Sequence, residues 1–158
     1  MLINDRKICA VWAVQICTTW INVIAETGYK VDVIFVVDES WSVRTDDFNL
    51  TKMFLTQLVG RLDSDCRPRV GLVTYSTDVD TAEAFNLSAH SSVADVQSAI
   101  DSLSYSGGHT YTHLALEYVR TVMLTSAAGD RPDVPNVVVV LTDGLPYNVV
   151  ETRVCIRM

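Results

Sequence analysis

The sequence predicts an α/β protein built on a doubly wound, mostly parallel sheet with helices on both faces. Two largely β-branched runs, residues 31–37 and 137–141, are typical of strands buried on both faces of such a sheet. Helical patterns separate the strands, which implies right-handed crossovers and one parallel sheet. With 158 residues, of which 49% are hydrophobic and 20% charged, the chain is long enough for one domain with a packed core.

Composition excludes several classes of partner and site. The formal net charge is −7 and no basic cluster is present, so nucleic acid and anionic membrane surfaces are poor candidates for binding. None of the four cysteines forms a Cys-x-x-Cys pair, which leaves zinc and thioredoxin-like sites without support. Cys9 and Cys17 lie near the start of the chain, and whether Cys66 and Cys155 pair is left open.

The first 25 residues have the pattern of a secretory signal peptide. Arg6 and Lys7 precede residues 8–25, which carry no charge. The most apolar part, residues 8–17, is too short to span a bilayer, and Ala25 ends a stretch of small residues suited to signal peptidase. We therefore expect a signal peptide at 1–25, an incomplete domain at 26–148 and an unassigned tail at 149–158. A membrane anchor, a buried amphipathic helix and a start foreign to the mature protein are the alternatives.

Two sequons agree with a secreted protein. They begin at Asn49 and Asn86, and each is a candidate for N-glycosylation. Tripeptides of this kind also arise by chance, so each is a weak signal by itself. Together with the predicted signal peptide they indicate a secreted or extracellular-matrix location.

The first half of the domain contains the first strand, a helix and two further strands. Residues 48–62 place apolar side chains at spacings of three and four, typical of one buried helix face, and Asp46 and Asp47 suit the first turn of that helix. Residues 70–75 form the second predicted strand. Residues 79–85 alternate loosely and carry acids, which indicates an exposed edge strand.

The second half leads through two helices to the last strand. Ser92 begins a capping-box pattern, followed by a short amphipathic helix. After the glycine-containing loop 107–112 we expect a helix over residues 112–124. Its predicted inner face consists of Ala115, Tyr118, Val119 and Val122. Residues 129–135 are a connector, and the apolar run 137–141 follows.

Oxygen-bearing side chains follow both buried strands. Asp38, Ser40 and Ser42 come directly after the first strand, Asp143 follows the last, and Thr110 lies in the glycine-containing loop. The carboxyl ends of parallel strands form the ligand-binding edge of open α/β sheets, so these side chains would meet if the two strands are neighbours. An all-oxygen donor set suits a hard cation such as Mg²⁺ or Mn²⁺. His109 and His113 are better explained as loop or surface histidines.

These motifs, in this order, resemble the von Willebrand factor A domain and its metal-ion-dependent adhesion site. The match rests on the Asp-x-Ser-x-Ser run from Asp38, the loop 107–112 and Thr142-Asp143-Gly144. The sequence around these motifs most resembles the A domains of fibril-associated collagens and matrilins. The resemblance implies that Ser40, Ser42 and Thr110 coordinate the ion directly, while Asp38 and Asp143 act mostly through water.

The chain departs from the family pattern at its end and at the site. Glu39 and Trp41 replace small residues, and His113 stands where many members have glycine. Family members continue past the Asp-Gly turn with further helices and about two strands, whereas only residues 145–158 follow here. We therefore expect a truncated domain whose strand at 137–141 has an unpaired apolar edge and which tends to associate.

Three functions from different classes are open. The leading one is a non-enzymatic adhesion or matrix-interaction module that binds a protein partner, with collagen or another matrix component as the candidate, through Mg²⁺ or Mn²⁺. A second is an inert or partly folded fragment of a larger matrix protein. The third is a metal-dependent phosphohydrolase, which would ordinarily place a second carboxylate where Ser40 stands. No motif for a nucleotide or another small-molecule substrate follows the first strand, and the oligomeric state is not predicted.

Overall fold

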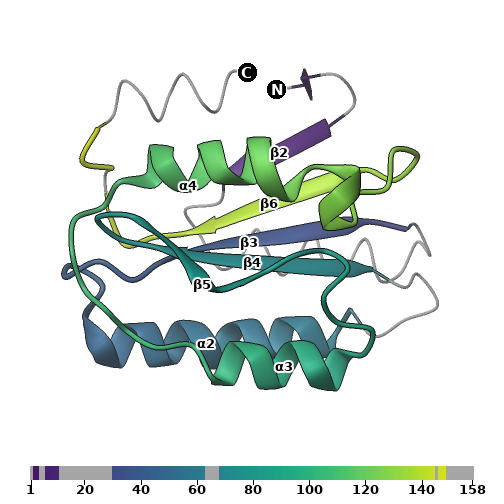
Figure 1. Cartoon of the computed structure of the whole chain (residues 1–158). Helices are drawn as coiled ribbons and strands as arrows, with labels where there is room; N and C mark the ends of the chain where they lie inside the picture. The colour runs from purple at the N-terminus through teal and green to yellow at the C-terminus, as the bar shows by residue number, and fades with distance from the viewer. Residues whose placement is uncertain (1, 4–5, 11–29, 63–67, 145, 149–158) are drawn as a thin grey trace.

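A mixed six-stranded sheet forms the centre of the computed structural model, which describes residues 2–3, 6–10, 30–62, 68–144 and 146–148. The strand order is β1-β2-β6-β3-β4-β5. The central strands β3 (Asp32–Asp38), β4 (Arg69–Tyr75) and β6 (Asn136–Leu141) run parallel, and β5 (Val79–Phe85) pairs antiparallel with β4 at one edge. The predicted doubly wound sheet and its exposed edge strand are confirmed (Figure 1).

Helices cover both faces of this sheet. Helices α2 (Arg44–Gly60) and α3 (Val93–Asp101) lie on one face, and α4 (Thr112–Tyr118) lies on the other (Figure 1). Each face has its own hydrophobic core. Alternate residues of β3 supply both, because successive side chains of a strand point to opposite faces: Phe35 packs in the α2/α3 core, whereas Ile34 packs in the α4 core.

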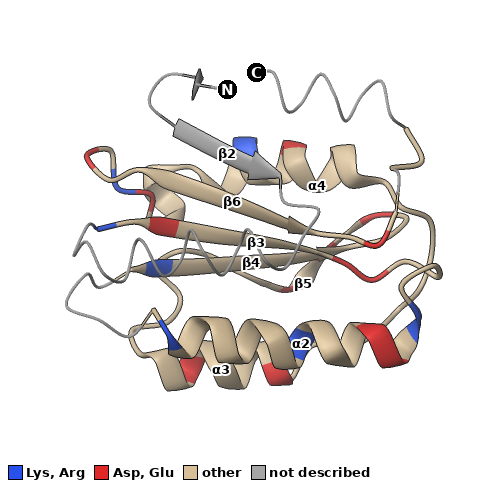
Figure 2. Cartoon of the chain, turned by 180° about the vertical axis from the view of Figure 1, so that it is seen from behind, with Lys and Arg blue, Asp and Glu red and all other residues tan. Residues whose placement is uncertain are grey.

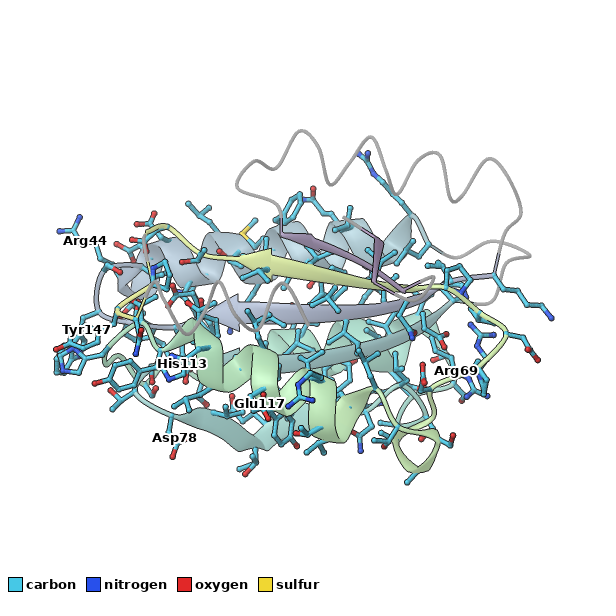
Figure 3. The ribbon with its side chains drawn as sticks, turned by 90° about the horizontal axis from the view of Figure 1, so that it is seen from above. Arg44, Arg69, Asp78, His113, Glu117 and Tyr147 are labelled. Atoms are coloured by element: carbon cyan, nitrogen blue, oxygen red, sulfur yellow. The ribbon has the colours of Figure 1, made fainter. Side chains whose placement is uncertain are left out.

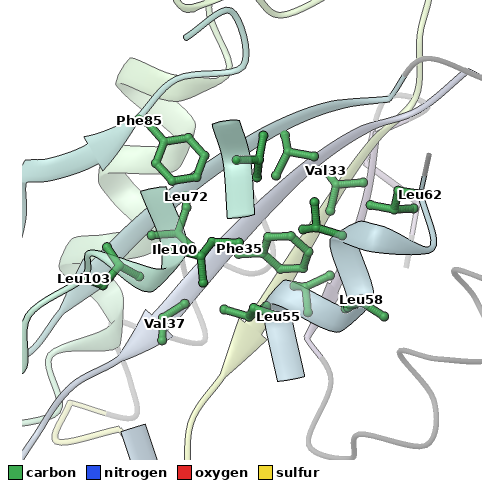
Figure 4. Close-up of a cluster of buried hydrophobic side chains, with 14 of the residues drawn as sticks. Val33, Phe35, Val37, Leu55, Leu58, Leu62, Leu72, Phe85, Ile100 and Leu103 are labelled. Carbon is green, nitrogen blue, oxygen red and sulfur yellow. The ribbon is translucent and has the colours of Figure 1, made fainter. Parts of the chain in front are cut away.

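The core beneath α2 and α3 explains why the sequence folds in this way. Its side chains come from β3, β4 and β6 and from the apolar faces of the two helices (Figure 4). Leu55 and Leu58 of α2 are buried, as the helical spacing predicts. Ser92 caps α3 by accepting a hydrogen bond from the Asp95 N–H, so the predicted capping residue is correct.

The helix predicted over residues 112–124 is interrupted. After α4 the chain forms a π-helical segment, η1 (Val119–Met123), closed by the Leu124 N–H on the Val119 carbonyl. The extra residue in a π turn rotates the following side chains about the helix axis. Met123 is therefore buried and Val122 is 40% exposed, so the predicted inner position of Val122 is wrong. A short 3₁₀ turn, η2 (Ser126–Ala128), leads to the connector before β6.

The expectation of an unpaired edge on β6 is also wrong. Strand β2 (Arg6–Ala10) pairs in parallel with β6, in a register that joins Lys7 to Val137 and Ala10 to Val140, and β1 (Leu2–Ile3) pairs antiparallel with β2. An apolar strand with free N–H and C=O groups is a template for another strand, and the N-terminal residues fill that position. After β6, residues 142–144 and 146–148 form no further strand.

The segment predicted to be a signal peptide, residues 1–25, therefore contains residues that pair with the sheet. Strands β1 and β2 both lie within the predicted signal peptide. The remaining residues of that segment lie outside the described residues, as do the tail 149–158, Cys66 and Cys155. Cleavage after Ala25 stays a prediction. Within the described part of the chain, no helix combines the length and the apolarity that crossing a membrane requires.

Candidate metal centre

Asp38 lies at the end of β3 and anchors the candidate site. Its side chain is 1% exposed. Oδ1 accepts a hydrogen bond from the Ser40 N–H at 2.9 Å, and Oδ2 accepts one from the Thr142 hydroxyl at 2.6 Å. The first bond turns the chain directly after β3, and the second joins this turn to the loop after β6. The parallel pairing of β3 with β6 thus brings the two sequence motifs together.

The three candidate hydroxyl ligands form one continuous chain of hydrogen bonds. Thr110 Oγ1 donates to Ser40 Oγ at 3.1 Å, Ser40 Oγ and Ser42 Oγ share a hydrogen bond of 3.0 Å, and Ser42 Oγ donates to Asp143 Oδ1 at 2.9 Å. Because Ser42 gives its proton to the carboxylate, Ser40 is the donor in the central pair. The structure therefore brings together all five residues singled out in the sequence, with Asp38 joined through the Ser40 N–H.

This spacing is compatible with coordination of a small divalent cation. Ligands at 2.0–2.1 Å in an octahedron have adjacent oxygens about 2.9 Å apart. The successive oxygens from Thr110 to Asp143 are separated by 2.9 to 3.1 Å. The separations of successive oxygens therefore match those of neighbouring ligands in one coordination shell. Nowhere in the described residues do three or more His, Cys, Asp or Glu side chains gather, so hydroxyl oxygens would have to complete any such shell.

Sequence reasoning missed the role of Thr142. The Thr-Asp-Gly motif gives this residue no role of its own, yet its hydroxyl donates to Asp38 and accepts the Gly144 N–H at 3.3 Å. It fixes both carboxylate-bearing loops relative to each other. Beneath it lies Tyr75, which is fully buried and shares a hydrogen bond of 3.0 Å with Thr112. Burial, and then the negative charge of Asp38, raise the pKa of Tyr75, which stays a neutral phenol.

Glu39 is a second residue whose environment the sequence did not reveal. It is 1% exposed, its N–H donates to the Tyr75 carbonyl, and its Oε1 accepts a hydrogen bond from Ser106 at 2.9 Å. Its Oε2 is buried and has no partner in the described residues. Burial raises the pKa of Glu39 above its ordinary value, while the Ser106 hydrogen bond opposes that shift. Glu39 therefore points into the protein, away from the role of a surface ligand.

Comparison with known proteins gives the family. The model of the von Willebrand factor type A domain matches residues 32–154. The chain belongs to the von Willebrand factor A family. The A-domain match covers the strands and loops that carry all five candidate ligands, and the resemblance seen in the motifs is confirmed.

The relatives of this A domain include the proteins that the motifs suggested. It is 41% identical to bovine (Bos taurus) matrilin-1 over 121 residues, which cover 74% of this chain and 22% of matrilin-1. It is 37% identical to the human (Homo sapiens) collagen alpha-1(XX) chain over 122 residues, 77% of this chain and 9% of the collagen. Mouse (Mus musculus) vitrin is 35% identical over 123 residues, which cover 77% of this chain and 19% of vitrin. The A domain thus spans about a fifth or less of each of these relatives.

Solved structures agree with the fold. Proximal thread matrix protein 1 from the mussel byssus superposes with a TM-score of 0.71 at 23% identity, covering 80% of this chain and 34% of the mussel protein. A structure of the same mussel protein with a zinc-occupied MIDAS motif superposes with a TM-score of 0.65 at 28% identity. The superposition covers 75% of this chain and 30% of the mussel protein. In that structure the mussel protein holds zinc at its own metal-ion-dependent adhesion site (MIDAS).

Proposed function

We propose that this A domain is a non-enzymatic adhesion module of the extracellular matrix that binds a protein partner through Mg²⁺ or Mn²⁺. The observation that carries the proposal is the hydrogen-bonded series of oxygens from Thr110 through Ser40 and Ser42 to Asp143. The kinship with matrilin-1, vitrin and a collagen chain supports a matrix setting, and the zinc-containing mussel structure supports a divalent ion.

The candidate ligands divide into direct and supporting groups. Ser40, Ser42 and Thr110 offer neutral hydroxyl oxygens for direct contact. Asp38 holds the Ser40 backbone and Asp143 holds the Ser42 hydroxyl, and either carboxylate could also bind the ion through water. A bound divalent ion supplies an electrophilic position that a partner carboxylate can occupy. Two direct carboxylates would neutralise the ion and weaken that attraction. The division between neutral and charged oxygens therefore favours binding of an acidic partner side chain over catalysis.

Secretion and glycosylation belong to the same proposal. Asn49 and Asn86 are both exposed; Asn49 lies within α2, and Asn86 lies in the turn that follows β5. The turn allows a glycosyltransferase easier access to the backbone than a formed helix does. If the chain is secreted, Asn86 is the site we expect to be modified.

The metal site is tested by calorimetry and thermal melting. We expect Mg²⁺ at one hundred times its dissociation constant to stabilise the wild-type chain by about 2.7 kcal/mol. Ser42→Ala should abolish most of this effect, because its hydroxyl stands in the middle of the series. Ser98→Ala, which removes an exposed hydroxyl from α3, is the matched control and should respond like the wild type.

Two outcomes would contradict the proposal. If the wild type and Ser42→Ala give the same titration curves with Mg²⁺ and with Mn²⁺, these residues do not form a metal site. Phosphate-ester turnover that disappears in Asp38→Asn would instead support the phosphohydrolase reading.

A further inference from the structure

Strand β5, at one side of the sheet, is protected against pairing with another chain. It carries Asp80 and Glu83, and its register against β4 is irregular. The Asp80 carboxylate also accepts hydrogen bonds from the Ala82 and Glu83 N–H groups, at 2.9 and 3.2 Å. Charged side chains and irregular pairing are devices that keep an edge strand from adding a further strand. This side of the sheet is therefore closed by its own residues.

Strand β6, at the other side of the parallel core, has none of these devices. Its six residues include no charge and no proline, and the strand is tan along its whole length in Figure 2. Val139 packs in the α2/α3 core, and Val138 and Val140 pack in the α4 core. Among the described residues, only β2 pairs with the outer edge of β6. The strand is therefore built to have a neighbour on that edge.

The strand that fills this edge lies in the segment that we expect to be removed on secretion. Strand β2 spans Arg6–Ala10, and the predicted cleavage follows Ala25. Residues 142–144 and 146–148, described after β6, supply no strand in its place. A chain whose β2 is displaced or removed therefore presents an apolar strand with free N–H and C=O groups.

A second copy of this chain is the partner that fits such an edge. Two copies related by a two-fold axis present the same edge to each other, and the two β6 strands then run antiparallel. With the axis at Val139, Val137 lies opposite Leu141 of the other copy, and Val138 lies opposite Val140. Directly opposite residues share a face of the sheet, so apolar side chains meet on both faces and no like charges oppose each other.

We propose that the outer edge of β6 is a homodimerisation surface, which residues 6–10 occupy in the uncleaved chain and a second copy occupies once they are displaced. The inference goes beyond the proposed function and does not depend on metal binding. It makes the N-terminal segment an internal competitor of dimer formation.

Antiparallel pairing fixes how the two candidate metal sites of such a dimer are directed. Arg44 follows the two serine ligands, and the Tyr147 N–H donates to the Thr110 carbonyl at 2.8 Å. In Figure 3, Arg44 and Tyr147 lie at one end of the molecule and Arg69 lies at the other. The two sites would therefore face opposite directions, so that one dimer joins two partner molecules.

Val139→Cys reports which strand occupies the edge. Cys9 is the neighbour of Val139 in the register of β2 and β6. Neighbouring strands lie about 4.8 Å apart, within the range of Cα separations that a disulfide spans. Under mild oxidation, the introduced thiol should bond to Cys9 within one chain when β2 is in place. In the symmetric dimer it should bond to its counterpart in the second copy. Serine replaces the remaining cysteines, which are Cys17, Cys66 and Cys155.

Ile8→Pro with Cys9→Pro opens the edge in the full chain. Successive N–H groups of a strand point to opposite sides, so one of the two prolines removes the donor that faces β6. Leu2→Pro with Ile3→Pro, which disturbs β1 and leaves β2 unchanged, is the matched control. Val137→Lys, added to the opened chain, places a charge on the edge of β6.

Sedimentation and non-reducing electrophoresis give the outcome for each variant, and slow amide exchange in residues 33–37 verifies that it is folded. We expect the parent chain and the β1 control to stay monomeric, with the disulfide within one chain. The opened chain should dimerise at least about ten-fold more tightly, because a strand tethered at millimolar effective concentration no longer competes. It should also form the disulfide between copies, and Val137→Lys should return it to a monomer.

Two results would overturn the proposal. One is an opened chain that is folded and stays monomeric. The other is an opened chain that associates without the disulfide between copies and irrespective of Val137→Lys, which would place the contact on another surface. If the two prolines abolish the slow amides, Ile8→Gly with Cys9→Gly, which weakens β2 without removing a donor, is judged by the same criteria.

Discussion

The hydrogen bond from Thr142 to Asp38 gives the sharpest test of how the site is built. Thr142→Val keeps the shape of the side chain but removes the donor 2.6 Å from Asp38 Oδ2, and it deprives the Gly144 N–H of its acceptor. Because Asp38 is 1% exposed, water cannot replace the lost donor without a rearrangement. A hydrogen bond to a charged acceptor contributes about 1.5–3 kcal/mol, so we expect a loss of about 2 kcal/mol in unfolding free energy.

The loss can be measured without metal, by urea unfolding in the presence of a chelator and by calorimetry. For a chain of this length, about 2 kcal/mol corresponds to a fall of about 6 °C in melting temperature. The matched control is Thr121→Val, whose hydroxyl donates to the Glu117 carbonyl on an exposed helix face, and it should change stability by less than about 0.5 kcal/mol. A Thr142→Val protein as stable as the control would refute the view that this bond joins the two halves of the site.

Three further predictions concern other parts of the molecule. Glu39→Gln should raise stability at neutral pH by about 1 kcal/mol, since it removes a buried, half-partnered charge. Because burial raises the pKa of Glu39, the unfolding free energy of the wild type should fall as pH rises from 4.5 through the folded-state pKa. The difference in unfolding free energy between Glu39→Gln and the wild type should therefore shrink toward pH 4.5. Urea unfolding at a series of pH values measures this difference. Asp32 is fully buried and paired with Arg131, so Asp32→Ala should cost about 3–5 kcal/mol in calorimetric unfolding, and a cost below 1 kcal/mol would contradict this. Deletion of residues 1–10 removes β2 from the edge of β6 and should produce concentration-dependent association in analytical ultracentrifugation, whereas a strictly monomeric product would show that β2 does not protect the edge.

The sequence predicted the centre of the fold because local pattern and tertiary role agree there. The run 33–37 is apolar at every position, and the structure uses both of its faces, so no other assignment fits it well. The convergence of Asp38 with Asp143 followed from strand ends alone. The role of Ser92 as a helix cap was also predictable, because a capping hydroxyl binds a backbone N–H only three residues further along the chain.

The features that were missed depend on contacts distant in sequence or on a local irregularity that breaks the helical period. Nothing in residues 6–10 distinguishes a strand from the start of a leader, because pairing with β6 is decided by the edge that β6 offers. The π turn at 119–123 shifts the buried face by one residue, and periodicity cannot reveal an insertion of that kind. The sequence shows Glu39 only as a departure from the family pattern, whereas contacts with Tyr75 and Ser106 turn its side chain inward.

The bond between Thr142 and Asp38 joins positions 104 residues apart in the sequence. Forming a bond between positions so far apart requires closing a long loop, and contacts of this kind slow folding. During synthesis, a nascent chain that has not yet emerged as far as β6 already contains both serines but lacks the loop that orients them. Ion capture should therefore follow the pairing of β6 with β3, which brings Thr142 and Asp143 to the two serines.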